Sequence, residues 1–220
     1  MYGLKKIKND GKNEFKDFVW PIKIGENTNV EVPSFYCLPE ARGNWSVLVG
    51  DRWAVVEFDE NDMVLFKDKR GEIEKCGIKK CKLIWFSKSH GNLLDYFDYK
   101  NFDSKTAYQW AVNIGDQYVM IDRITESEWA YKWAIYFGDD DIMIDRITDS
   151  EWAFKWARDI GNKDIMIDRI TEPEWSSHWI AIIGDMEKMI EKFPGNHIRA
   201  NKIPTKTEMG SIIYDEITNN

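Results

Sequence analysis

The feature that most constrains this fold is an internal repeat with a period of 23 residues. The string Ile-Asp-Arg-Ile-Thr begins at Ile121, Ile144 and Ile167. Three further rows run in register with it: Trp129, Trp152 and Trp175; Trp133, Trp156 and Trp179; and Gly138, Gly161 and Gly184. A leading copy near residues 107–115 matches in part. A short fixed period is typical of units that bury their apolar faces only by stacking on one another.

Each unit predicts two short helices. The string Thr125-Glu126-Ser127-Glu128 fits a capping box with the threonine as the N-cap, and the next two units carry equivalents. Apolar residues at helical spacing follow as far as Gly138, where a residue without Cβ suits the end of a helix. Residues 139–147 then predict a second helix, and residues 186–193 predict the start of a last partial unit.

Positions that are the same in every unit serve what every unit needs, which is folding. We therefore interpret both tryptophan rows as core, because large Trp and small Ala side chains in neighbouring rows can interdigitate. The repeated Asp-Arg pairs predict a ladder of salt bridges and cap contacts between units, rather than a catalytic signature.

Function is then sought where the units differ. The side chains at these positions are predicted to flank the apolar stripe and to project from the stack. The predicted partner-binding residues are Tyr131, Lys132, Tyr136, Asp139, Asp140, Asp141, Phe154, Lys155, Arg158, Asp159 and His178.

The chain's charge is concentrated in the repeats. The whole chain has 30 basic and 38 acidic residues, and residues 96–193 hold 11 basic and 20 acidic ones, a net charge of −9. Residues 1–95 have a net charge of +1. An acidic surface attracts a basic partner and repels the phosphates of nucleic acid. We therefore expect a protein partner with a basic surface, and we do not expect the repeats to bind nucleic acid directly.

The sequence predicts no metal site and no cofactor. The run Asp139-Asp140-Asp141 lacks the alternating acids and the glycine of a calcium loop, and it has no histidine suited to zinc. Cys76 and Cys81 have no second pair. A run of acids at a helix N-terminus explains the cluster as well, because the helix dipole favours negative charge there.

The N-terminal region has strand-like runs in place of helical periodicity. Residues 53–58, 63–66 and 81–86 predict strands, with a turn at 59–62, and residues 18–24 and 46–49 predict edge strands. The predicted fold class is α+β: a small, mostly antiparallel β domain at 1–95 followed by an α-solenoid of short two-helix repeats at 96–193. The predicted units lie near 96–118, 119–141, 142–164 and 165–187. Residues 194–220 form a tail, in which 210–214 could dock on the β domain as a strand.

The order KIGENTNVE, SFYCLPEA, DRWAVVEFDENDMVLF and KKCKLIWFS resembles a small β domain of unknown function common in phage and prophage genes. The repeat pattern IT-x-x-EWA-x-x-WA-x-x-x-G is similar to short helical repeats found in such genes. The resemblance implies a mobile-element origin and transfers no catalytic residue.

Two functional hypotheses follow. The first is a non-enzymatic interaction protein that acts through the acidic repeats; its specific form is an inhibitor of a host defence nuclease or CRISPR complex. The alternative is a nucleic-acid-processing or modifying enzyme with its site in the β domain, for which Cys37 and His90 could form a pair. No apolar run reaches the roughly 18 residues of a membrane span, and no secretory signal is apparent. Three cysteines favour a reducing compartment, so we expect the cytoplasm, that of a bacterial host if the gene is phage-encoded.

Overall fold

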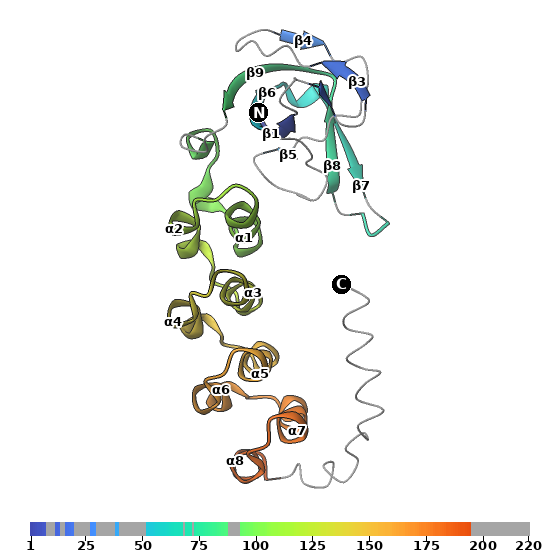
Figure 1. The fold of residues 1–220 in the computed structure, drawn as a ribbon. Helices are drawn as coiled ribbons and strands as arrows, with labels where there is room; N and C mark the ends of the chain where they lie inside the picture. Colours follow the sequence, from blue (N-terminus) through green and yellow to red (C-terminus); the bar gives the residue numbers. More distant parts are fainter. Residues whose placement is uncertain are drawn as a thin grey trace. The chain divides into compact units, whose positions relative to one another are not determined.

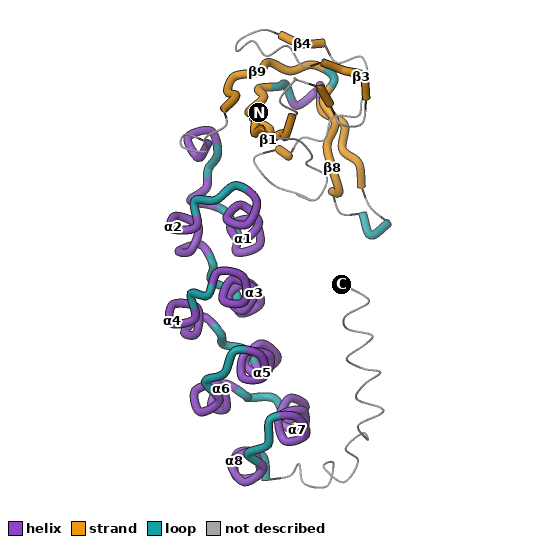
Figure 2. The backbone as a smooth tube through the Cα atoms, viewed as in Figure 1, coloured by secondary structure: helices purple, strands orange, loops and turns teal. Residues whose placement is uncertain are grey.

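A computed structural model describes residues 1–7, 12–13, 16–19, 27–29, 38–39, 52–67, 69–71, 73–87 and 93–194. The described part is α+β, as predicted, with a small antiparallel sheet region and eight α-helices (Figures 1 and 2). The predictions for Cys37, His90, residues 46–49 and residues 210–214 lie outside the described residues. The chain divides into two compact units, Met1–Ile124 and Thr125–Asn220.

The first unit contains a five-stranded antiparallel sheet in the order β4-β9-β6-β1-β5. Its strands are β1 (Tyr2–Ile7), β4 (Asn27–Asn29), β5 (Leu38–Pro39), β6 (Arg52–Glu57) and β9 (Lys80–Ser87). Two hairpins accompany it: β2 (Lys12–Asn13) with β3 (Lys16–Val19), and β7 (Met63–Lys67) with β8 (Ile73–Ile78). The 3₁₀ turn η2 (Glu60–Asp62) joins β6 to β7, and the Asp59 carboxylate caps it by accepting from the Asn61 amide.

The sequence prediction identified β6, β7, β9 and the turn between β6 and β7. It missed the six-residue strands β1 and β8 and the short strands β2, β4 and β5. Strand β1 pairs along its whole length with β6 and also pairs with β5. The sequence pattern did not predict β1, because its two central lysines, Lys5 and Lys6, interrupt the apolar alternation expected of a half-buried strand. Leu4 and Ile7 are nevertheless fully buried in the core of the first unit.

The first unit continues past residue 95 into the leading repeat. Two 3₁₀ turns, η3 (Leu93–Tyr96) and η4 (Tyr99–Asn101), precede α1 (Ser104–Asn113), α2 (Gln117–Met120) and η5 (Ile121–Arg123). Phe97 and Phe102 each lie 5.4 Å from the Trp110 ring, centroid to centroid. The boundary between the compact units therefore falls after the first helix pair, whereas the composition shift suggested residue 95.

The described part of the second unit, residues 125–194, consists of three helix pairs (Figure 1). They are α3 (Ser127–Phe137) with α4 (Asp140–Met143) and η6 (Ile144–Arg146), α5 (Ser150–Asp159) with α6 (Lys163–Arg169), and α7 (Pro173–Ile182) with α8 (Met186–Lys192). Residues 186–193, predicted to begin a last partial unit, contain helix α8, which lies one period after α6 and contacts α7. Glycine ends the first helix as expected in the α3 pair, where Gly138 adopts a left-handed φ of 78° at the C-cap.

The inner tryptophan row forms the core. Trp110 in the first unit, and Trp133, Trp156 and Trp179 in the second, are all fully buried. The indole N–H groups of Trp110 and Trp133 donate to Asp116 and Asp139 at 3.3 and 2.8 Å. The outer row of Trp129, Trp152 and Trp175 is only partly buried, so the prediction that both rows are core holds for the inner one alone.

The predicted threonine N-caps are wrong. The helices begin one residue later, so that Glu126, Asp149 and Glu172 are the N-caps, and the Asp149 carboxylate accepts from the Trp152 amide at 3.1 Å. The reason is a contact between repeats. The Ser150 hydroxyl accepts from the Thr171 amide at 2.9 Å, and that hydroxyl lies 3.2 Å from the Thr171 hydroxyl. Ser127 and Thr148 repeat this arrangement.

The predicted Asp-Arg ladder is confirmed between α6 and the preceding pair. Arg169 lies 3.4 Å from the Asp145 carboxylate and donates to the backbone carbonyls of Ile144 and Ile147. In the register of Arg169, Lys192 donates to the carbonyls of Ile167 and Asp168 at 3.0 and 2.6 Å. Carbonyls at helix C-termini lack partners within their own helix, and a cation from the next repeat satisfies them here.

Candidate interaction surface

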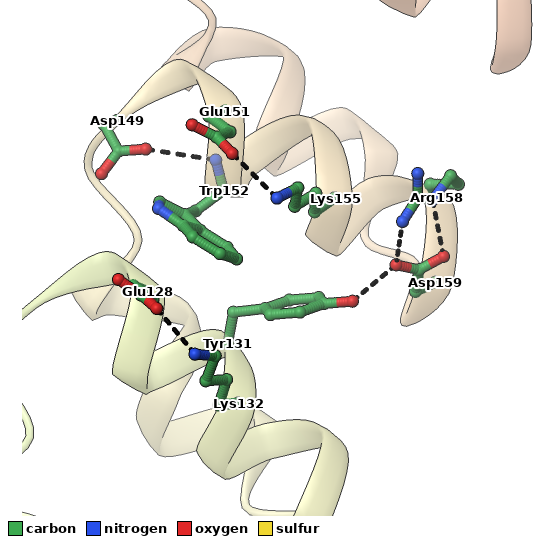
Figure 3. Close-up of polar contacts among 9 residues, drawn as sticks. All are labelled: Glu128, Tyr131, Lys132, Asp149, Glu151, Trp152, Lys155, Arg158 and Asp159. Carbon is green, nitrogen blue, oxygen red and sulfur yellow. Dashed lines mark hydrogen bonds and ion pairs between the residues drawn. The ribbon is translucent and has the colours of Figure 1, made fainter. Parts of the chain in front are cut away.

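Two of the predicted partner-binding lysines, Lys132 and Lys155, lie against outer tryptophans; Figure 3 shows Lys155 beside Trp152. Lys132 Nζ lies 4.2 Å from the Trp129 ring centroid and 2.6 Å from Glu128 Oε1. Lys155 makes the same contacts, 4.1 Å from the Trp152 ring and 2.8 Å from Glu151 Oε1. Each lysine is thus held by a carboxylate one turn earlier and by an aromatic face, two contacts that both favour a cation.

Tyr131 links α3 to α5 (Figure 3). Its ring lies 5.4 Å from the Trp152 ring, and its hydroxyl donates to Asp159 Oδ2 at 2.6 Å. Arg158 donates to both oxygens of the same carboxylate, at 2.7 and 2.9 Å. The structure therefore brings together three of the predicted site residues, Tyr131, Arg158 and Asp159.

The ionisation of this group follows from its surroundings. Partial burial, followed by the hydrogen bond to Asp159, raises the pKa of Tyr131 to about 12. Partial burial also raises the pKa of Asp159, but hydrogen bonds from Arg158 and Tyr131 outweigh that effect and leave its pKa lowered. The phenol is therefore protonated and the carboxylate ionised near neutral pH, which suits a structural hydrogen bond.

Phe154 does not project from the helices. Its side chain is 3% exposed, so the prediction that it is a surface contact is wrong. Its ring lies 5.6 Å from Trp175 in the next repeat, and the Arg158 guanidinium lies 5.7 Å from the ring. His178, in the register of the two lysines, is exposed and lies 5.0 Å from Trp175, ring to ring.

The acidic run at the start of α4 is less available than the sequence suggested. Asp139 is half-buried and accepts the Trp133 indole N–H, so it serves the core. Asp140 is half-buried and Asp141 is exposed. Tyr136, on α3, is 58% exposed and does project as predicted.

Sequence reasoning missed two exposed isoleucines. Ile142 on α4 and Ile165 on α6 occupy the same repeat position and are 49% and 47% exposed. They were missed because every apolar residue that recurs in the repeats was assumed to be buried in the core. A detectable signal was present, since each precedes a recurrent methionine and one residue turns a helix by about 100°. Met143 and Met166 are fully buried, so the isoleucines lie off the core face.

The described residues offer little to enzyme chemistry. Among them, no group of three or more His, Cys, Asp or Glu side chains could hold a metal ion. A pocket of about 340 Å³ in the first unit is lined by Met1, Glu57, Phe58, Asp59, Asp62, Lys80, Cys81 and Lys82. Burial raises the pKa of the Cys81 thiol to about 12. The thiolate, which is the nucleophile, is therefore scarce at neutral pH.

Within the described part of the chain, no helix is long and apolar enough to cross a membrane. Comparisons with protein-family models, with curated proteins and with solved structures find no match to this chain.

Proposed function

We propose that this chain is a non-enzymatic interaction protein whose helix pairs stack as an α-solenoid and present an acidic surface to a basic protein partner. The solenoid is supported by contacts that recur every 23 residues between consecutive pairs of the second unit. Ser127 and Ser150 bind the amide of the threonine that precedes the next repeat. Tyr131 and Phe154 each stack on the next outer tryptophan.

The binding proposal rests on a difference between basic and acidic side chains: several basic ones contact groups within the repeats, whereas many acidic ones are exposed. Several basic side chains of the repeats are directed to internal partners: Lys132 and Lys155 to glutamates, and Arg169 and Lys192 to backbone carbonyls. Carboxylates remain at the surface. Asp141 and Asp168 are exposed, and the side chains of Asp145 and Asp164 stay 86% and 90% exposed although they pair with Arg169 and Lys188. A basic partner is therefore attracted to the repeats at long range.

The test is affinity capture of a partner at low and at high salt, with a charge variant of each unit. We expect Asp141→Asn with Asp168→Asn to reduce capture, because both carboxylates are exposed on the repeats. Glu60→Gln with Asp95→Asn removes the same charge from exposed positions in the first unit and should leave capture unchanged. Capture that survives high salt, or that both double variants reduce equally, would refute the proposal.

A more specific version of this proposal names the class of partner. The sequence resemblance to phage and prophage genes supports a mobile-element protein that acts in the bacterial cytoplasm. The partner would then be a host nuclease or CRISPR complex, since nucleic-acid grooves are basic. In that case a DNA duplex should compete with the chain for the captured partner. Binding of the chain alongside DNA would argue for a basic surface outside the groove.

A further inference from the structure

We propose that Ile142, Ile165 and the carboxylates beside them bind an amphipathic basic helix of the partner. We call this surface the isoleucine row. The inference rests on the proposed function and adds to it a place on the repeats and a chemical class of ligand. The occupant is a helix that carries apolar side chains along one stripe and Lys or Arg beside that stripe.

The isoleucines of this surface do not contribute to the buried core of the repeats. The buried side chains of the second helices are Met143 in α4 and Met166 with Ile167 in α6. Ile142 and Ile165 each precede the methionine and remain about half exposed. Val119 stands at the same repeat position in α2 and is 37% exposed, so three repeats keep an apolar residue where burial does not demand one.

Carboxylates flank each isoleucine. Asp141 and Asp164 immediately precede the isoleucines, and Asp145 and Asp168 follow three residues later. At about 100° per residue, the two positions lie one above the other on the same side of the isoleucine. Each isoleucine is therefore bordered on one side by two carboxylates. All four carboxylate residues are exposed.

Three basic side chains border the row, one fewer than its four carboxylates. Lys188, on α8, lies 2.8 Å from Asp164, and Lys163 precedes Asp164 on α6. Arg169 lies 3.4 Å from the Asp145 carboxylate and also donates to backbone carbonyls of the preceding pair. The partner's cations would then complement Asp141 and Asp168.

The repeat spacing favours a helical occupant. Consecutive pairs pack through their first helices, α3 on α5 and α5 on α7, and packed helices lie about 8–10 Å apart. Residues seven positions apart on a helix are separated by about 10.5 Å along its axis and share one face. In the stacked array of the proposed function, the second helices α4 and α6 share this period, and a partner helix with apolar residues at i and i+7 can then place one against each isoleucine.

Other occupants fit the charge less well. A second copy of this chain would bring carboxylates against carboxylates, and an anionic lipid surface would be repelled in the same way. A chain of lysines without apolar residues would satisfy the carboxylates but leave the isoleucines in water. These occupants predict different outcomes in one experiment.

The experiment measures binding of a fluorescein-labelled peptide to the full chain by fluorescence anisotropy. The probe is an 18-residue helix of leucine and lysine whose leucines form one stripe at i, i+3 or i+4, and i+7, as about 18 residues give five helical turns. A peptide of the same composition in scrambled order is the control for charge. We expect the amphipathic peptide to bind at least about tenfold more tightly than the scrambled one, because only it buries the isoleucines.

The matched variants are Ile142→Ser with Ile165→Ser, and Ile135→Ser. Ile135 is a 55% exposed isoleucine on α3. We expect the double variant to weaken the amphipathic peptide by about tenfold or more and Ile135→Ser to leave it unchanged. The thermal midpoint by circular dichroism should stay close to that of the parent chain in both cases, which separates loss of binding from loss of folding.

Three results would overturn the isoleucine row. They are equal binding of the two peptides, equal loss in both variants, and a dimer in sedimentation velocity that the double variant dissociates. If Asp141→Asn with Asp168→Asn weakens both peptides while the isoleucine variant weakens neither, a basic partner remains supported and the isoleucine row falls. If neither peptide binds and no partner is captured in a salt-dependent way, both proposals fail.

Discussion

Tyr131 and Phe154 occupy the same position in successive repeats. Their side chains differ only in the tyrosine hydroxyl, and their surroundings differ accordingly. The Tyr131 hydroxyl donates to Asp159, which lies 28 residues later. The residue 28 positions after Phe154 is Ile182, which offers no acceptor, and the phenylalanine there has no hydroxyl to satisfy. The interface between α3 and α5 thus has both a donor, Tyr131, and an acceptor, Asp159. At the same positions, the interface between α5 and α7 has neither, because Phe154 and Ile182 are apolar. This is expected when partly buried polar groups need partners.

We predict that Tyr131→Phe lowers the free energy of unfolding by about 1 kcal/mol, the typical net contribution of one hydrogen bond. The ring contact with Trp152 is kept, so the loss should be confined to the hydroxyl. Urea denaturation followed by circular dichroism measures the change. Tyr118→Phe is the control, because the Tyr118 side chain is 86% exposed. An equal effect of the two substitutions would contradict the structural role of the Tyr131 hydroxyl.

The pH dependence of stability should differ between the parent chain and Tyr131→Phe. The pKa of Tyr131 is raised to about 12 in the folded chain, against about 10 in an unfolded one. A raised pKa contributes stability that is fully present below the unfolded value and is lost as pH rises toward the folded value. Between pH 10 and about 12 the parent chain should therefore lose stability faster than the variant. Parallel urea midpoints across this range would refute the assignment.

At the scale of elements, the start of each helix is decided by the repeat before it. Ser150 is fully buried at the first residue of α5, and its hydroxyl accepts from the amides of Thr171 and Glu172 at 2.9 and 3.2 Å. In the last pair, Pro173 replaces this serine. A proline there suits the first helical turn and offers no hydroxyl to a following repeat.

We predict that Ser150→Ala lowers the free energy of unfolding by about 1–3 kcal/mol, since it leaves buried amides without their acceptor. The matched control is Ser177→Ala on α7. Its hydroxyl makes one contact with its own helix, at 3.4 Å to the Pro173 carbonyl, and the substitution should change stability by less than about 0.5 kcal/mol. Thermal or urea unfolding measures both variants. Comparable losses would show that the serine does not join the repeats.

At the scale of the whole molecule, equivalent repeats should be removable as units. Deletion of residues 150–172 takes out one period and joins Asp149 to Pro173, with Tyr131 placed to meet Trp175 in the role of Trp152. We expect the shortened chain to remain helical and to unfold cooperatively at lower stability, because repeats contact mainly their neighbours. Circular dichroism and urea unfolding test this.

A deletion that breaks the period is the control for this experiment. Removal of residues 150–160 takes away α5 alone and leaves α6 without the helix against which it packs. We expect this chain to lose helical signal and cooperativity. If both deletions unfold the chain to the same extent, the pairs are not independent units.

The β region shows the limit of pattern reading at this scale. Residues 53–58 and 63–66 are short apolar runs typical of strands, and the structure places β6 and β7 there. Strand β1 carries two adjacent lysines, and its identity follows from pairing with β6, more than 40 residues away in the sequence. Pairing of that kind is a property of the folded sheet and leaves little local trace.

The sequence by itself determined the period, the two helices of each unit and the buried tryptophan row, because periodicity and residue volume are local properties that repeat. The tertiary structure decided which recurrent residues face water. Phe154 is buried by Trp175 in the next repeat, the predicted threonine caps are replaced because Ser127 and Ser150 bind the following repeats, and Ile142 and Ile165 stay exposed because no helix of the second unit covers them among the described residues. Each of these outcomes depends on residues that lie about one period away, and their positions are set only when the units pack.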